Sequence, residues 1–497
     1  MNSLLPSEVF YFASQAQSNI YNLTYVKSEI KETDAQSVPS HYDIMVAYYR
    51  PASDSSTNKQ YCLLHRFSSD GDMIKTVTKN MDFVYIPGAS DIVCIDALFD
   101  EVNKEYIFGV GFVKDGDKGY LNIYGESSLD KLPECCLSFS SLSYVPLQLT
   151  HTYYISPTTS KLQWAFILSS GNPFADPLLS GSAPSATRLR PPVRVFAQLS
   201  DTGKGVQEDE CKKSKDTLSV GSRPRQRLNP SESINTIYGE LGTEAAHSLF
   251  PELATIPGVK ILHMDFHVTS KHRPFRLAAF GAQDGWIGVV QTDMEQLTVL
   301  HQFSFSHESP ITNVKLFNQF PSAQVSSHSG ARLKSPVCSS SKFWDAQFDL
   351  LVCSSFEPAV VYSRILEHEY LSLDNQIVLP LSADFDHVNC ASVGDFNFDG
   401  LPEIVLGTFG QRLLFYQWDS NKPVDEDACL TLDGGYRLVA QKSLIGPVHC
   451  ISPPLDLVGD GLDAMVVLSG RGLHVYQHDV DDILELIRKR IGSSKPI

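Results

Sequence analysis

The stretch DFNFDGLPEIVLGTFGQRLLFYQ, from Asp395 to Gln417, decides the predicted fold, because it recurs from Asp456 to Gln477 as DLVGDGLDAMVVLSGRGLHVYQ. Each copy has an aspartate-rich turn ending in Asp-Gly-Leu, an apolar strand, a turn of small residues and a second strand ending in Tyr-Gln. Such a hairpin is half of a propeller blade and cannot bury both of its faces alone. The two copies therefore predict further blades around a common axis.

Five weaker units precede these copies and follow the same order of strands and turns. Asp284-Gly285, for example, separates two alternating apolar runs, which is a strong hairpin signal. We predict an all-β chain whose residues 1–479 form a seven-bladed β-propeller, with six or eight blades as alternatives. The units begin near residues 20, 91, 145, 258, 311, 388 and 449.

Both ends of the chain have predicted roles in this fold. The segment SEVFYF, residues 7–12, is expected to supply the outer strand of the last blade and so close the ring. Residues 480–497 are expected to form a short amphipathic helix and tail. Asp481 at the start of this helix and Arg488 near its end match the sign of the helix dipole.

Three polar segments, residues 173–192, 203–234 and 320–342, interrupt the repeats and are predicted to be disordered loop insertions, because they bury too little apolar surface to offset the entropy of ordering. The second insertion carries a basic cluster. We interpret it as a solvated loop, with a contact for an acidic partner or a phosphorylated segment as the alternative. The cluster comprises Lys212, Lys213, Lys215, Arg223, Arg225 and Arg227.

Composition excludes several classes of protein. The formal net charge of −17 argues against a nucleic-acid-binding surface. The sequence contains no run of eighteen apolar residues, which a transmembrane segment would require, and its first residues lack the pattern of a secretory signal. A cytoplasmic location is therefore expected. The 10 cysteines include no C-x-x-C pair and are expected to be reduced and mostly buried.

The first aspartate-rich turn is a candidate calcium loop. Asp395, Asn397 and Asp399 alternate before Gly400, and Glu403 follows eight residues after the first aspartate. Calcium takes six to eight oxygen ligands, and this spacing directs several side-chain oxygens toward one point. No other cofactor is expected.

A structural role for the same residues is the alternative. Asp and Asn side chains also stabilise tight turns by accepting hydrogen bonds from the backbone. The second copy keeps Asp456 and Asp460 but has Val458 and Ala464 at two of the ligand positions. A turn that forms there without those ligands favours the structural alternative.

No catalytic motif is present. The chain has no G-x-S-x-G elbow, no phosphate-binding glycine loop and no H-E-x-x-H helix. His263 and His267 lie in a predicted strand and are expected to be structural, and the acids of residues 425–427 to be solvated loop charges. A hydrolase with a metal in the central funnel is the enzymatic alternative, and it requires His and Asp side chains to converge there.

The aspartate-rich repeats resemble the FG-GAP repeats of integrin-alpha-type propellers. Taken in order, five segments are similar to those of the kaptin family, and the long polar insertions are the departures from it. These segments are LNIY (residues 121–124), LFPEL (249–253), EPAVVY (357–362) and the stretches 395–417 and 456–477.

The resemblance implies a non-enzymatic scaffold in a KICSTOR-like complex. Its implied partners are an FG-GAP-containing propeller subunit, a large scaffold subunit and the GATOR GAP complex. The implied role is to recruit that GAP complex to lysosomes and to restrain TOR signalling when amino acids are scarce. The resemblance also implies an alternative, an actin-associated adaptor at actin-rich cell edges. An extracellular calcium-loaded adhesion propeller is a third possibility, disfavoured by the missing signal sequence.

Overall fold

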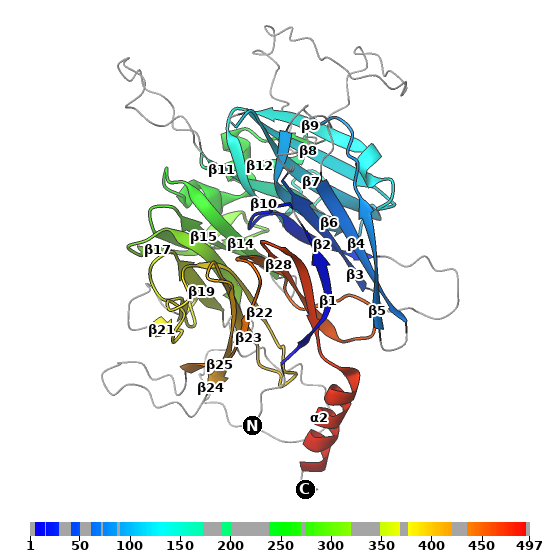
Figure 1. Cartoon of the computed structure of the whole chain (residues 1–497). Helices are drawn as coiled ribbons and strands as arrows, with labels where there is room; N and C mark the ends of the chain where they lie inside the picture. Colours follow the sequence, from blue (N-terminus) through cyan, green and yellow to red (C-terminus); the bar gives the residue numbers. More distant parts are fainter. Residues whose placement is uncertain are drawn as a thin grey trace.

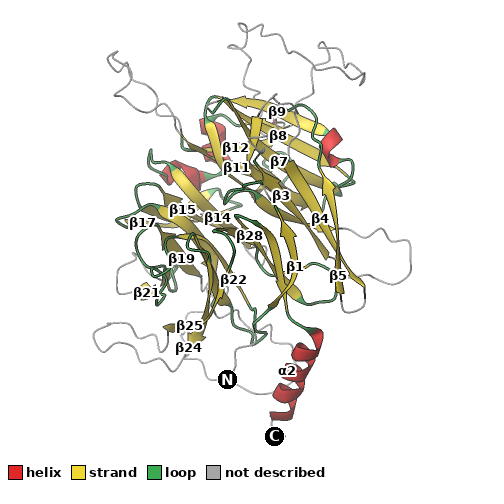
Figure 2. Ribbon diagram, in the orientation of Figure 1, coloured by secondary structure: helices red, strands yellow, loops and turns green. Residues whose placement is uncertain are grey.

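Seven antiparallel sheets surround a central axis in the computed structural model (Figure 1). Strands make up nearly all of the body, as Figure 2 shows. From blade 1 to blade 7 each inner strand contacts the next, and blade 7 packs against blade 1 through a shared hydrophobic cluster. The predicted seven-bladed β-propeller is therefore confirmed. The structure describes residues 5–14, 16–28, 41–49, 61–70, 73–86, 90–116, 118–171, 191–199, 238–269, 274–319, 348–367, 376–419 and 435–493.

Blades 1 to 6 each take four consecutive strands from the chain, in order from the inner to the outer strand. Blades 1 to 3 consist of β2 (Leu23–Ser28), β3 (His41–Tyr48), β4 (Tyr61–Asp70) and β5 (Met73–Asn80); β6 (Ser90–Asp100), β7 (Glu105–Lys114), β8 (Lys118–Glu126) and β9 (Cys136–Leu142); and β10 (Val145–Ile155), β11 (Leu162–Gly171), β12 (Val193–Gln198) and β13 (Tyr238–Glu240). Blades 4 to 6 consist of β14 (Ile261–Thr269), β15 (Phe275–Ala282), β16 (Trp286–Asp293) and β17 (Thr298–Ser306); β18 (Ile311–Phe317), β19 (Asp349–Ser354), β20 (Val360–Tyr362) and β21 (Gln376–Val378); and β22 (Val388–Gly394), β23 (Glu403–Thr408), β24 (Arg412–Asp419) and β25 (Gly435–Ser443).

Blade 7 combines strands from both ends of the chain. Its outer strand β1 pairs with β29, which confirms the role predicted for SEVFYF. The two strands approach closely at Gly472, where an added Cβ would lie 2.0 Å from the carbonyl oxygen of Phe12, and where φ is +150°. Only glycine fits such a position. The blade consists of β26 (Val448–Ile451), β28 (Asp463–Ser469), β29 (Gly472–Gln477) and β1 (Ser7–Ala13), with the short β27 (Leu455–Asp456) paired to β28.

The hydrophobic core is a ring of interfaces between blades. Met45 and Phe108 belong to the cluster between blades 1 and 2. Ile44, on the other face of the same strand as Met45, packs with Leu468 between blades 7 and 1. Each face of a blade is therefore buried against a neighbour, which is why an isolated hairpin of this sequence is not a stable unit.

Inner strands are also joined by polar contacts near a repeated irregularity. In six of the seven blades the pairing of the first two strands shifts register within the first residues. Close to this bulge, the Thr312 hydroxyl donates to the carbonyl of Val388 at 2.5 Å, and the Asn389 amide donates to the carbonyl of Val448 at 2.8 Å. These bonds fix the spacing of consecutive blades.

The helical segments lie at the margins of the propeller. They are η1 (Leu132–Glu134), α1 (Thr243–Leu249), η3 (Pro251–Thr255) and α2 (Val480–Ser493). Helix α2 is found where the sequence predicts a C-terminal helix, and it projects away from the strands in Figure 1. Its Ile483 is buried, whereas Leu484 is exposed. Among the described residues, no helix combines the length and apolar character needed to cross a bilayer.

Other predictions concern the insertions and the cysteines. The predicted insertions 173–192, 203–234 and 320–342 fall outside the described residues, apart from Pro191 and Pro192. The seven cysteines within the described part of the chain are free thiols, as expected. Burial raises the pKa of the buried thiols, Cys390 among them, and so keeps them protonated.

Candidate functional site

The aspartate-rich turn of blade 6 connects β22 to β23. The Asp395 carboxylate accepts hydrogen bonds from the backbone N–H groups of Asp399 and Gly400, at 3.0 and 2.8 Å. Gly400 has φ of +87°, a conformation that glycine adopts without steric cost. The first aspartate therefore holds the turn from within.

The copy in blade 7 uses the same arrangement. Asp456 accepts hydrogen bonds from the N–H groups of Gly459 and Gly461, at 2.6 and 3.0 Å. Gly461 has φ of +80°, close to that of Gly400. The frame of the turn is thus shared although the residues between differ.

A glutamine at the end of each hairpin completes this frame. Asp399 accepts from the N–H of Leu401 at 2.8 Å and from the Gln417 amide at 2.9 Å. In blade 7 the Gln477 amide lies 3.3 Å from the Asp460 carboxylate. The repeated Tyr-Gln seen in the sequence therefore marks a contact between the second strand and the turn, a role that the sequence analysis did not assign.

The blade 6 turn also holds a buried glutamate that blade 7 lacks. Glu403 accepts hydrogen bonds from the N–H groups of Phe396 and Asn397, at 2.8 and 3.1 Å, and from the Asn397 side-chain amide. Burial raises the pKa of Glu403 to about 8, with the charge of Asp399 as the next cause. Ala464 stands at the matching position of blade 7.

The structure brings the four candidate calcium ligands, Asp395, Asn397, Asp399 and Glu403, to one turn. Each accepts hydrogen bonds from the turn itself or its flanking strand; the side-chain oxygen Oδ1 of Asn397, for example, accepts from the N–H of Asp399 at 2.8 Å. In the described part of the chain, no three His, Cys, Asp or Glu side chains are grouped so as to hold a metal ion. The geometry fits the structural role, and calcium binding at residues 395–403 stays a prediction.

A second candidate is the central cavity of about 350 Å³, lined by the inner strands. His151 Nδ1 lies 2.7 Å from the Asp96 carboxylate, and Lys315 Nζ lies 2.9 Å from that of Asp265. Burial acts to lower the pKa of His151 and of Lys315, but the facing carboxylates outweigh it and both pKa values are raised. These two acids are therefore engaged in ion pairs between neighbouring blades.

The two histidines of β14 lie in different surroundings. His263 faces the cavity, bonds the Asn313 amide at 3.0 Å and has its pKa lowered to about 4 by burial. His267 instead lies against the ring of Phe348, 4.7 Å between centroids. Both have the structural character that the sequence predicts, and they share no metal position.

A buried ion pair anchors the LFPEL segment between blades 3 and 4. The Arg276 and Glu252 side chains are fully buried, with Nε and Oε1 separated by 2.5 Å. Arg276 also donates to the carbonyl of Tyr153 at 2.8 Å and lies over the ring of Phe250. Thr292 donates to the second carboxylate oxygen of Glu252 at 3.1 Å. This network positions α1 and η3 and has the character of a structural anchor.

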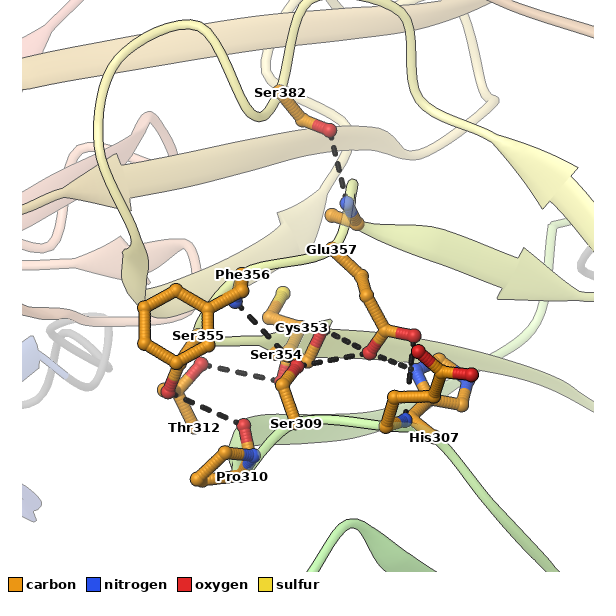
Figure 3. Close-up of polar contacts among 12 residues, drawn as sticks. His307, Ser309, Pro310, Thr312, Cys353, Ser354, Ser355, Phe356, Glu357 and Ser382 are labelled. Atoms are coloured by element: carbon orange, nitrogen blue, oxygen red, sulfur yellow. Dashed lines mark hydrogen bonds and ion pairs between the residues drawn. The ribbon is translucent and has the colours of Figure 1, made fainter.

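A third polar network supports the turn between β19 and β20 (Figure 3). The Glu357 carboxylate accepts from the hydroxyls of Ser309 and Ser354, at 2.9 and 3.2 Å, and lies 3.4 Å from Nδ1 of His307. Phe356 is exposed at the tip of this turn. The Glu-Pro pair at residues 357 and 358 predicts a turn here, and the structure confirms it. Nothing local in the sequence indicates the contacts of Glu357 with Ser309 and His307.

Two further sequence features lie outside the described residues. They are the basic cluster in the segment 212–227 and the acids of residues 425–427.

The fold and these sites define a class: a seven-bladed β-propeller whose clustered polar groups hold turns and join blades. The family model described as "KICSTOR complex protein kaptin" matches residues 7–173 and 229–488. The mouse KICSTOR complex protein kaptin is 28% identical over 447 residues, which is 88% of this chain and 84% of that protein. The chain therefore belongs to the kaptin family of KICSTOR complex proteins.

Similarity to solved structures is low in sequence. A structure of BBS1N in complex with ARL6DN is 9% identical with a TM-score of 0.44, and the alignment covers 96% of this chain and 98% of that one. The Dos1 propeller is 9% identical with a TM-score of 0.44 and 95% coverage of both chains.

Proposed function

We propose that this chain is a non-enzymatic scaffold subunit of a KICSTOR-like complex. The observation that carries the proposal is the family match, which spans most of the propeller, including the closing strand β1 and helix α2 up to residue 488. A propeller suits this role because a rigid core displays many loops as contact surfaces. The acids and bases of the central cavity support the non-enzymatic part of the proposal, because they are engaged in ion pairs between neighbouring blades.

Within that complex, we propose that the chain helps to hold the GATOR GAP complex at the lysosomal membrane and so restrains TOR signalling when amino acids are scarce. Its proposed direct partners are an FG-GAP-containing propeller subunit and a large scaffold subunit. The chain works in the cytoplasm and reaches the membrane through these partners, because a net charge of −17 disfavours direct contact with anionic lipids.

Affinity purification of the tagged chain from cells, followed by mass spectrometry after a moderate-salt wash, tests the proposal. We expect KICSTOR and GATOR subunits in near-equal amounts with the chain. Recovery of actin as the main partner overturns the proposal in favour of the actin-associated adaptor, and recovery of neither overturns both. No cofactor is required for the proposed role, so the result is expected to be the same with a calcium chelator in the buffer.

A further inference from the structure

We propose that a continuous arc of loops on one face of blades 5, 6 and 7 binds another protein subunit of the same assembly, one that presents an apolar surface bordered by lysine and arginine side chains. This inference deepens the proposed function and rests on it. The loop arc consists of residues 306–310, 355–359, 379–387, 409–411 and 444–447.

The topology places all five segments on the same face. Successive strands of a blade are antiparallel, so the turn between the second and third strands lies at the same end as the link from the outer strand to the next blade. Residues 355–359 and 409–411 are such turns in blades 5 and 6. Residues 306–310, 379–387 and 444–447 are such links before blades 5, 6 and 7.

Hydrogen bonds join each segment of the loop arc to the next. The contacts run in order around the propeller, so the loops form one connected surface. They are Glu308 N–H to the Glu357 carboxylate at 3.3 Å, Ala359 N–H to the Ser382 hydroxyl at 2.9 Å, Phe409 N–H to the carbonyl of His387 at 2.9 Å, and Leu444 N–H to the carbonyl of Gln411 at 2.9 Å.

Large apolar side chains are exposed along this surface. Many of the other exposed ones lie singly on outer strands, such as Val77 on β5, and single exposed apolar residues are ordinary on protein surfaces. The loop arc instead carries four within three blades. They are Phe356, Ile445, Leu381 and Phe409, with exposed fractions of 85, 67, 54 and 47%.

Phe356 has the features of an anchor. Its N–H is bonded to the Ser309 hydroxyl at 3.4 Å, and the Glu357 network holds the same turn. In Figure 3 the Phe356 ring points away from the Glu357 carboxylate. A cavity of about 520 Å³ opens beside the turn, with Tyr362 and His307 among its lining residues. A pre-organised aromatic residue next to a pocket loses little entropy on binding, and such residues dominate binding energy at interfaces.

The charge of the loop arc specifies the chemistry of the partner. The structure describes the whole arc, which contains the four carboxylates of Glu308, Glu357, Asp384 and Asp386 and no lysine or arginine. Arg412 begins the strand after one of the turns, and its guanidinium lies over the ring of Phe385. Arg471, exposed on the β28–β29 turn of the same face, lies beside Gly446. The acidic border therefore follows blades 5 and 6, and it fits a partner with an apolar centre and a basic border.

Paired serine substitutions test the surface. We compare Phe356→Ser with Ile445→Ser in one variant against Val102→Ser with Leu162→Ser in a control, because Val102 and Leu162 are exposed on the opposite face. Each full-length variant is co-expressed with the tagged FG-GAP-containing propeller subunit and, separately, with the tagged large scaffold subunit. We expect about a tenfold or greater loss of recovery for the loop-arc variant with one of these subunits, and less than a twofold change for the control.

Charge reversal tests the chemistry independently of the apolar contacts. Glu308→Lys with Asp384→Lys should weaken the same interaction and reduce its dependence on salt concentration. Unchanged thermal unfolding of each variant shows that the fold is intact. Recovery of neither subunit by the unsubstituted chain contradicts the proposed function itself. If the subunits are recovered equally with the unsubstituted chain, the serine variant and the charge-reversed variant, the loop-arc inference is overturned. The scaffold proposal then still stands.

Discussion

The aspartate-rich turns of blades 6 and 7 have the same hydrogen-bonded frame but differ inside it. Both use a first aspartate, a glycine with positive φ and a distant glutamine. Only blade 6 adds the buried Glu403, where blade 7 has Ala464. The comparison shows that the frame alone makes the turn, and that Glu403 and Asn397 are additions specific to one blade. Four sets of substitutions test which contacts stabilise both turns and which stabilise only one.

Glu403→Ala should have the largest effect. The substitution gives blade 6 the residue of blade 7 but leaves the N–H groups of Phe396 and Asn397 without their acceptor. We expect the free energy of unfolding to fall by about 2–4 kcal/mol, because buried donors lose their partner and a cavity remains. Urea denaturation measures this loss. Ala464→Ser, a small change at the matching position, is the control, and a loss below about 1 kcal/mol for Glu403→Ala would show that the glutamate adds nothing to the shared frame.

Asp395→Ala and Asp456→Ala remove the same element from the two turns. Each leaves two backbone N–H groups without an acceptor, in turns that are partly exposed, and we expect a loss of about 1–3 kcal/mol for each variant. The two losses should agree within about 0.5 kcal/mol. Chemical denaturation of both proteins provides the comparison, which fails if only one of the two positions matters.

Asp399→Ala tests whether Asp399 stabilises the protein through hydrogen bonds of the turn or by binding calcium. The lost contacts, to Leu401 and Gln417, lie within the protein, so we expect a decrease of about 1–2 kcal/mol that persists in a calcium chelator. Thermal unfolding with calcium and with chelator gives the answer, with Asp460→Ala as the matched control. A decrease that disappears completely once calcium is removed would instead establish the calcium loop.

The glutamine contacts should have the smallest effects. Gln417→Ala and Gln477→Ala each remove one link between strand and turn, and we expect about 0.5–1.5 kcal/mol. The loss should be larger for Gln477, which is buried and also donates to the carbonyl of Leu462 at 3.1 Å. Differential scanning calorimetry resolves such a difference, and the opposite order would show that burial and the Leu462 contact do not determine the size of the loss.

Much of the fold was predictable because its signals are local. Asp284-Gly285 and the copies at 395–417 and 456–477 are turns and strands within a few residues. The starts of the seven units favour seven blades, with six or eight as alternatives. The polar sites were harder to predict from the sequence. Glu252, in the link between blades 3 and 4, pairs with Arg276 of β15, and neither has a neighbour in sequence that indicates the other.

The loop arc was missed for a different reason. Phe356 and Ile445 belong to the short connections SFEPA (355–359) and LIGP (444–447), and nothing local shows that both lie on one face. That inference needs the number and direction of the strands between them, which only the assembled topology supplies. Periodic sequence patterns identify buried side chains more readily than the exposed side chains that form a binding surface.

The pairing of β1 with β29 has a consequence for how the protein is made. Blade 7 needs residues 7–13 together with residues 448–477, so it cannot assemble until nearly the whole chain has been synthesised. At ordinary translation rates, roughly 25–90 seconds separate the emergence of these two segments from the ribosome. During that interval β1 has no strand partner, and the side of blade 1 that will face blade 7 has no cover. Nascent chains of this protein are therefore expected to need chaperone protection until the last blade is complete.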